Sequence, residues 1–156
     1  MKISEILEVE FISPKVEGND KETVLNNMVD LVSKSSKIID KEKVRNAIFN
    51  REKIMSTGVG KGFAIPHGKT DGITDIVAAF GITENDINFE SLDGEPVKFI
   101  FLLVGKENLV GPHLKLLSRI SRLLNKDEFR TKLASATTSE EIKELFEQEE
   151  KAYFES

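Results

Sequence analysis

The sequence predicts an α/β fold in which helices cover both faces of a β-sheet within one domain. Apolar residues recur at helical spacing near both ends of the chain, whereas its middle holds short apolar runs between turn residues. The run Phe99–Val104 is continuously apolar, which is typical of a strand covered on both faces. The length of 156 residues suits a single core, so we expect one domain over residues 1–156.

Two helices are predicted before residue 56. The first covers about residues 20–34 and begins after a polar N-cap at Asp20. Its apolar positions follow helical spacing: Val24, Leu25, Met28, Leu31 and Val32. The second begins at Asp40 and is expected to end near Asn50-Arg51. Arg51 is therefore expected beside the glycine-rich loop that comes next.

Three strands and three further helices are predicted after this loop. The strands are expected at residues 63–65, 76–80 and 97–104, with a turn at 93–96 before the third. A helix begins at Gly111-Pro112-His113, with proline in its first turn. Its core face is expected to consist of Leu114, Leu117, Ile120 and Leu124. Helices at 127–134 and after a capping box at 138–141 complete the chain, and we expect the tail 147–156 to fray.

Composition excludes several classes of protein. The absence of cysteine excludes disulfides, thiolate catalysis and thiolate metal sites. The net charge of −5 argues against nonspecific nucleic-acid binding, which depends on clustered lysine and arginine. Phe99–Val104, the longest apolar run, is too short to cross a bilayer, and the N-terminus lacks the apolar core of a secretory signal. We therefore expect a cytoplasmic chain with no direct membrane insertion and no nucleic-acid partner.

The segment Ser56–Gly68 presents one of the two histidines after a glycine-rich stretch. Because the ordinary pKa of histidine lies near neutrality, much of His67 would be uncharged and nucleophilic in the cell. Gly68-Lys69-Thr70 does not complete a nucleotide-binding P-loop, because residue 63 is Phe and Pro66 lacks an N–H. His67 is thus a candidate nucleophile. Gly58, Gly60 and Gly62 do not form a G-x-G-x-x-G motif, and the alternative for these glycines is a mobile turn between a helix and a strand.

His113 and Arg51 are the other candidate site residues. His113 lies in the first turn of a helix, where backbone N–H groups favour an anion, and Arg51 suits bidentate contact with a phosphoryl group. The alternatives are a partly exposed, water-bonded His113 and an Arg51 paired with Glu42 or Glu52. The two histidines lie far apart in the sequence without a short ligand spacing, so we expect no metal site and no cofactor.

Several ordered motifs resemble the enzyme IIA domain of the fructose/mannitol class of the phosphoenolpyruvate-dependent sugar phosphotransferase system, which includes the nitrogen-regulatory enzyme IIA. The resemblance covers nearly the whole chain, from about Ile6 to Phe146. It rests on these residues: Asn50-Arg51-Glu52, Ser56-Thr57-Gly58, Gly60, Gly62, Ala64–Gly68, Leu92–Val97, His113-Leu114 and Leu117.

The resemblance implies a mixed β-sheet flanked by helices and a core over about residues 6–146. It also implies a phosphocarrier: His67 accepts a phosphoryl group from the phosphohistidine of HPr, or of an HPr-like carrier, and passes it to an enzyme IIB partner. His113 would stabilise the phosphoryl group. Arg51, with Ser56 and Thr57, would line the phosphoryl-binding site. No nucleotide is consumed at this step.

Several functions remain open within and beyond this family. A member serves either in sugar uptake or as a nitrogen-regulatory protein whose phosphorylation state is read by regulatory target proteins. The segments 56–60 and 64–69 favour the fructose or nitrogen type over the mannitol type. A competing class is a phosphodiesterase with His67 and His113 as general acid and base, and Arg51 or Lys69 as a clamp. A third is a binding module that senses a metabolite or a partner without being phosphorylated.

Overall fold

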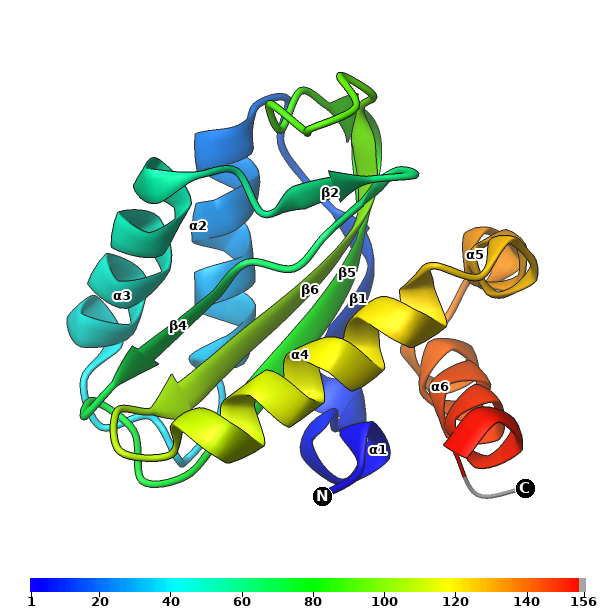
Figure 1. Cartoon of the computed structure of the whole chain (residues 1–156). Coiled ribbons are helices and arrows are strands. Elements are labelled where there is room, and N and C mark those ends of the chain that lie inside the picture. Colours follow the sequence, from blue (N-terminus) through cyan, green and yellow to red (C-terminus); the bar gives the residue numbers. More distant parts are fainter. Residues whose placement is uncertain (155–156) are drawn as a thin grey trace.

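The computed structural model describes residues 1–154, which form a six-stranded sheet between two layers of helices (Figure 1). The helices are α1 (Ile3–Ile6), α2 (Lys21–Val32), α3 (Lys41–Ile54), α4 (Val110–Leu124), α5 (Asp127–Ser135) and α6 (Ser139–Phe154), with a short 3-10 turn at Val9–Phe11. The strands are β1 (Ile12–Val16), β2 (Gly58–Gly60), β3 (Phe63–Ala64), β4 (His67–Thr70), β5 (Val77–Ile87) and β6 (Val97–Lys106). The expected α/β class is confirmed.

The sheet is mixed, as the resemblance implied. Its order is β1-β5-β6-β3-β2, and β4 also pairs with β6. The β5–β6 pair is antiparallel, whereas β1 runs parallel to β5, and β3 and β4 run parallel to β6. Both β3 and β4 lie along one edge of β6, with Phe63 opposite Phe99 and His67 opposite Leu103. The dipeptide Ile65-Pro66 separates them, because Pro66 has no N–H for a strand ladder.

Strand β6 is the centre of the hydrophobic core and is covered on both faces, as its continuous apolar run predicted. Phe101 faces α4 and α6, where its ring lies 5.6 Å from that of Phe146 in an edge-to-face contact. Leu102 faces α2 and α3 and packs with Met28 and Ile48. Figure 1 shows α2 and α3 on one side of the sheet and α4 across the other. Buried apolar side chains alternate along β6 and so build two cores on one sheet.

Helix α3 runs one turn farther than the sequence suggested. The expected end near Asn50-Arg51 was wrong, because the helix continues to Ile54. The guanidinium of Arg51 donates to the carbonyl of Met55 at 2.8 Å and so satisfies a backbone acceptor at the helix end. Arg51 therefore lies inside the last helical turn.

The C-terminal segment is also more ordered than expected. Residues 147–154 continue helix α6, so the expected fraying of these residues was wrong; residues 155 and 156 lie outside the described part of the chain. The carboxylate of Glu150 is almost fully buried and accepts the backbone N–H groups of Ile3 and Ser4 at 2.6 and 3.0 Å. It thereby connects α6 to α1. Within residues 1–154, no helix combines the length and the hydropathy needed to cross a membrane.

Candidate functional site

His67 is the first residue of β4, beside β6 at the edge of the sheet. Its ring is half-buried, and its Nδ1 lies 2.8 Å from the carbonyl oxygen of Ile65. Because a carbonyl oxygen can only accept, we assign the proton to Nδ1, which leaves the lone pair on Nε2. The fold thus orients a neutral imidazole with Nε2 as its free nucleophilic atom.

Gly68 allows this strand to approach α3 closely. A Cβ at residue 68 would lie 3.0 Å from the carbonyl carbon and oxygen of Ala47, so a larger residue would push β4 away from the helix. Arg51 lies one turn beyond Ala47 on the same helix. The close packing of β4 on α3 therefore fixes His67 relative to Arg51.

His113 lies in the first turn of α4 and contacts His67. The two ring centroids are 5.7 Å apart, and the ring planes make an angle of 55°. His113 is only 2 % exposed, so the alternative of a partly exposed, water-bonded residue was wrong. Among the described residues, neither ring nitrogen of His113 has a hydrogen-bond partner. A buried ring with unsatisfied nitrogens beside a nucleophile is ready to bond an additional polar group.

The pKa values of both histidines favour the neutral rings. Burial lowers the pKa of His113 to about 4, and the charges of His67 and Lys69 add to this effect. Burial also lowers the pKa of His67, and the charge of Arg51 lowers it further. The hydrogen bond to the Ile65 carbonyl and the charge of Glu52 oppose this by raising the pKa. His113 is therefore uncharged at neutral pH. This makes it a poor general acid and weakens the phosphodiesterase alternative.

Arg51 directs positive charge toward His67 from the last turn of α3. In the part of the chain that the structure describes, it forms no ion pair with Glu42 or Glu52, the partners considered in the alternative interpretation. Glu42 pairs with Arg45 at 3.3 Å, and Glu52 pairs with Lys21 at 2.9 Å. One guanidinium nitrogen of Arg51 is used by the Met55 carbonyl. The others remain available for an oxyanion.

Ser56 and Thr57 fix the loop after α3. The hydroxyl of Ser56 donates to the carbonyl of Phe89 at 2.6 Å and accepts the N–H of Gly58 at 3.1 Å. Thr57 donates its N–H and its hydroxyl to the carboxylate of Glu52, at 2.8 and 2.6 Å. A direct contact of these hydroxyls with a phosphoryl group stays a prediction. Beyond the hydroxyls, the glycine-rich stretch forms the ordered β2–β3 hairpin, so the expectation of a mobile turn was wrong.

Two charged residues near the site were not predicted to belong to the phosphocarrier site: Lys69 was considered only as a clamp of the phosphodiesterase alternative, and Glu52 only as a partner of Arg51. Lys69, on β4, is exposed, and its charge lowers the pKa of both histidines. Glu52 is buried between Lys21 and Thr57. The spacing of Lys69 two residues after His67 on a strand could have indicated a shared face. Within residues 1–154, no three His, Cys, Asp or Glu side chains are grouped as metal ligands.

Exposed apolar side chains lie at the ends of the two helices that carry Arg51 and His113. Ile54 and Met55 end α3 with 80 % and 58 % of their surface exposed, and Val110 and Leu114 lie in the first turns of α4 at 47 % and 59 %. Figure 1 shows β4 between these two helices. Leu114 was expected in the core, but the buried face of α4 instead carries His113 and residues such as Leu116, Ile120, Leu123 and Leu124. We call Ile54, Met55, Val110 and Leu114 the apolar rim.

Comparison with known proteins identifies the family of the chain. The family model described as "Phosphoenolpyruvate-dependent sugar phosphotransferase system, EIIA 2" matches residues 5–149. The fructose-specific EIIABC component of Bacillus subtilis is 38 % identical over 97 % of this chain, which spans 24 % of that protein's length. A nitrogen regulatory protein of Bradyrhizobium diazoefficiens is 35 % identical, over 91 % of this chain and 92 % of its own length.

Solved structures agree with this assignment. The nitrogen regulatory protein IIA-Ntr of Neisseria meningitidis superimposes with a TM-score of 0.85 at 33 % identity, over 92 % of this chain and 98 % of its own. Enzyme IIA of the Escherichia coli mannitol system, solved in complex with phosphorylated enzyme IIB, shares the fold with a TM-score of 0.77 at 18 % identity, over 91 % and 99 % of the two chains. The chain belongs to the EIIA 2 family of the phosphoenolpyruvate-dependent sugar phosphotransferase system, whose domains are phosphotransferase components that carry phosphohistidine.

Proposed function

We propose that this chain is a phosphocarrier that accepts a phosphoryl group on Nε2 of His67 from phosphorylated HPr, or an HPr-like carrier, and passes it to an enzyme IIB component of the fructose type. The observation that carries the proposal is the pairing of two rings. The Nε2 atom of His67 is free and nucleophilic, and the buried ring of His113 beside it has two unsatisfied nitrogens. The proposal places the chain in the cytoplasm with its phosphoryl donors.

The transfer reaction needs one bond to form and one to break. The lone pair on Nε2 of His67 forms the new N–P bond, and the N–P bond of the donor histidine breaks with its electron pair returning to the donor nitrogen. The ring of His67 becomes more positive during attack. The hydrogen bond from Nδ1–H to the Ile65 carbonyl stabilises that charge and keeps the ring in place. Onward transfer to enzyme IIB reverses these steps.

The transferred phosphoryl group spreads negative charge over its three outer oxygens. Arg51 and Lys69 provide positive charge near His67, which adds to the lowering of the His67 pKa by burial. Neutral His113 carries one N–H, which can be donated to a phosphoryl oxygen in this buried position. We propose that Arg51 and His113 bind the phosphoryl group directly, with Ser56 and Thr57 shaping the loop that lines it.

The apolar rim supports docking of partner proteins over His67. Its four side chains lie at the C-terminal end of α3 and in the first turns of α4, the helices that carry Arg51 and His113, and exposed apolar patches with a polar surround are typical of protein contact sites. The mannitol enzyme IIA of E. coli pairs with enzyme IIB. We propose an equivalent pairing here, with HPr and enzyme IIB using this surface in turn.

The second candidate is a nitrogen-regulatory role, in which other proteins respond to the phosphorylation state of His67. The identities of 35 % and 33 % to nitrogen regulatory proteins favour it. Both candidates share the accepting step and differ in the fate of the phosphoryl group on His67. A fructose-type carrier gives its phosphoryl group quickly to a fructose enzyme IIB, whereas a regulatory protein retains it in the same mixture.

The test is incubation with phosphoenolpyruvate, enzyme I and HPr, and then intact-mass measurement. We expect one added phosphoryl group that is labile in acid and stable in base, and we expect none on His67→Ala. Addition of a fructose-type enzyme IIB should then remove the group from the parent protein. A parent chain that gains no phosphoryl group would overturn the proposed function, and retention in the presence of enzyme IIB would favour the regulatory candidate.

A further inference from the structure

We propose that Glu52 is a positioning residue for phosphoryl transfer and that Lys21, at the start of α2, holds it in place. The proposal rests on the proposed function, in which His67 carries the phosphoryl group. It assigns a role to a buried ion pair that touches neither histidine. The pair acts on the transfer step through the loop that begins at Thr57.

The carboxylate of Glu52 is buried, accepts two hydrogen bonds and forms one ion pair. Glu52 is 7 % exposed; its Oε2 accepts the Thr57 N–H at 2.8 Å, its Oε1 accepts the Thr57 hydroxyl at 2.6 Å, and Lys21 Nζ lies 2.9 Å from Oε2. A buried charge is costly unless it is paired and hydrogen-bonded, and here both conditions are met. The carboxylate therefore has one well-defined position.

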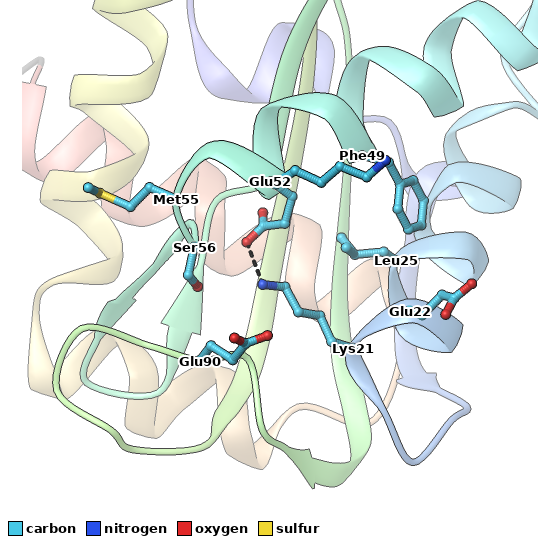
Figure 2. Close-up of a pocket in the computed structure, with 9 residues that line it drawn as sticks. Lys21, Glu22, Leu25, Phe49, Glu52, Met55, Ser56 and Glu90 are labelled. Atoms are coloured by element: carbon cyan, nitrogen blue, oxygen red, sulfur yellow. Dashed lines mark ion pairs between the residues drawn. The ribbon is translucent and has the colours of Figure 1, made fainter.

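This position links three segments of the chain around the site. Glu52 comes directly after Arg51 in the last turn of α3, Thr57 begins the loop toward His67, and Lys21 opens α2. Lys21 also donates to the carbonyl of Phe89 at 3.2 Å, the same carbonyl that accepts the hydroxyl of Ser56. Figure 2 shows Lys21 and Glu52 pointing toward each other between these segments. Rotation of the Glu52 side chain would release the loop and the end of the helix that carries Arg51.

Glu52 also acts on His67 through its charge. Its carboxylate raises the pKa of His67, in opposition to Arg51 and Lys69. A buried carboxylate with a purely structural role is not among the charges that shift the pKa of His67. Glu150 provides the comparison: it is 1 % exposed, accepts two backbone N–H groups and lies 3.5 Å from Arg119, but it holds α1 to α6.

A cavity of about 720 Å³ opens beside this pair. Its lining includes Lys21, Glu52, Ser56, Phe49 and Met55, and Lys21 reaches the carboxylate from this cavity (Figure 2). Truncation of Lys21 to alanine would therefore leave space open to small solutes. A propylammonium ion matches the part of the side chain that is removed and can enter from solvent.

The main experiment compares Glu52→Gln with the matched control Glu150→Gln. Both substitutions remove one buried charge that accepts two hydrogen bonds and lies beside one cation, so both should lower the urea midpoint. Single-turnover transfer from phosphorylated HPr should slow roughly ten- to hundredfold in Glu52→Gln, because misplacement of reacting groups has effects of that size. Glu150→Gln should keep the parental rate. Rates are normalised to the folded fraction of each protein.

The pH profile separates positioning from simple loss of structure. Attack requires neutral His67, so the parental rate falls on the acid side of the His67 pKa. Since Glu52 raises that pKa, its removal lowers it, and the acid limb should move to lower pH in Glu52→Gln. The limb should not move in Glu150→Gln. Equal normalised rates and unshifted profiles in both variants would overturn the proposal.

Lys21→Ala keeps the proposal testable if Glu52→Gln does not fold. We expect slow transfer in Lys21→Ala and a saturable recovery with propylammonium, but not with 1-propanol at the same ionic strength. Parental transfer in Lys21→Ala, or slow transfer that propylammonium does not restore, would contradict the role of Lys21 in holding Glu52. A parent protein that gains no phosphoryl group on His67 would instead contradict the proposed function.

Discussion

The ring of His113 lies 5.7 Å from the ring of His67, centroid to centroid, although the two residues belong to different elements. His67 begins β4 and His113 lies in the first turn of α4. The parallel pairing of β4 with β6 makes this possible, because it places His67 beside the strand that leads into α4. The contact brings a nucleophilic ring and a buried hydrogen-bonding ring to one point at the sheet edge.

Substitution of His67 should abolish phosphorylation without unfolding the protein. His67→Ala removes the nucleophilic Nε2, while its half-buried ring contributes little packing. We expect no added mass after incubation with phosphoenolpyruvate, enzyme I and HPr, and a urea midpoint close to that of the parent. Phosphorylation of the variant at the parental level would assign the nucleophile to another residue.

Substitution of His113 should slow onward transfer while still allowing phosphorylation of His67. His113→Ala removes a neutral donor beside the moving charge, and loss of one such donor costs about 3–4 kcal/mol in well-organised sites and less in a site open to solvent. Stopped-flow transfer to enzyme IIB measures the effect. Leu116→Ala is the control, since it truncates a buried side chain on the same helix. Equal rates in the two variants would make His113 a packing residue.

The buried histidine also predicts the pH dependence of stability. The pKa of His113 falls from 6.5 to about 4 on folding, so the unfolded chain binds more protons at acid pH. The contribution of neutral His113 to the free energy of unfolding should therefore be fully present above about pH 6.5 and be lost as the pH falls toward 4. Urea midpoints of the parent and of His113→Ala across this range measure the effect. The variant should lose less stability than the parent; parallel curves would contradict a neutral buried His113.

Arg51→Lys should impair phosphoryl arrival more than stability. Lysine keeps the positive charge but loses the planar fork that can hold two phosphoryl oxygens. Among the described residues, Arg51 has no carboxylate partner, and its hydrogen bond to Met55 is exposed, so the urea midpoint should hardly change. The transfer rate from phosphorylated HPr and the urea midpoint are measured together. A parental rate would remove Arg51 from the site.

The sequence indicated which side chains lie close together better than it indicated the boundaries of the elements that carry them. Arg51, His67 and His113 stand out in the sequence because they belong to short ordered motifs. The fold brings the two rings into contact and brings Arg51 close enough for its charge to lower the pKa of His67. The end of α3 could not be predicted, because charged residues after Asn50 are typical of a solvent-exposed helix end. In the fold, Glu52 is instead buried through contacts with Lys21 and Thr57, and the contact with Lys21 joins residues far apart in the sequence.

The buried face of α4 and the strands without an apolar run were also not predictable from the sequence. The leucine pattern of α4 allowed Leu114 in the core, but the buried position of His113 turns the helix so that Leu114 faces solvent. Strands β1, β2 and β4 were not predicted. β2 has the sequence Gly-Val-Gly and lies in the stretch that was expected to be a loop. β1 contains Pro14, and β4 has the sequence His-Gly-Lys-Thr, so neither has an apolar run. Their pairing with β5 and β6 is decided by tertiary contacts.

A substitution at Gly105 tests whether the position of the His113 ring beside His67 matters for transfer. A Cβ at this position would lie 2.4 Å from Nδ1 of His113, which is too close for any two such atoms, so the ring or the strand must move. Gly105→Ala should displace the His113 ring and slow onward transfer, with a stability loss of about 1–3 kcal/mol from overpacking. A crystal structure of the variant would measure the displacement, and transfer to enzyme IIB would measure its effect.

Gly111→Ala is the matched control for this prediction. It lies in the first turn of α4, two residues before His113, and a Cβ there would meet no atom within 4 Å. The same methyl group is thus added beside the same helix start without touching the ring, and transfer should stay at the parental rate. If Gly105→Ala also transfers at the parental rate while its His113 ring is displaced, the position of that ring does not matter for transfer. The role of His113 in stabilising the phosphoryl group would then be wrong, whereas His67 would keep its role as the nucleophile.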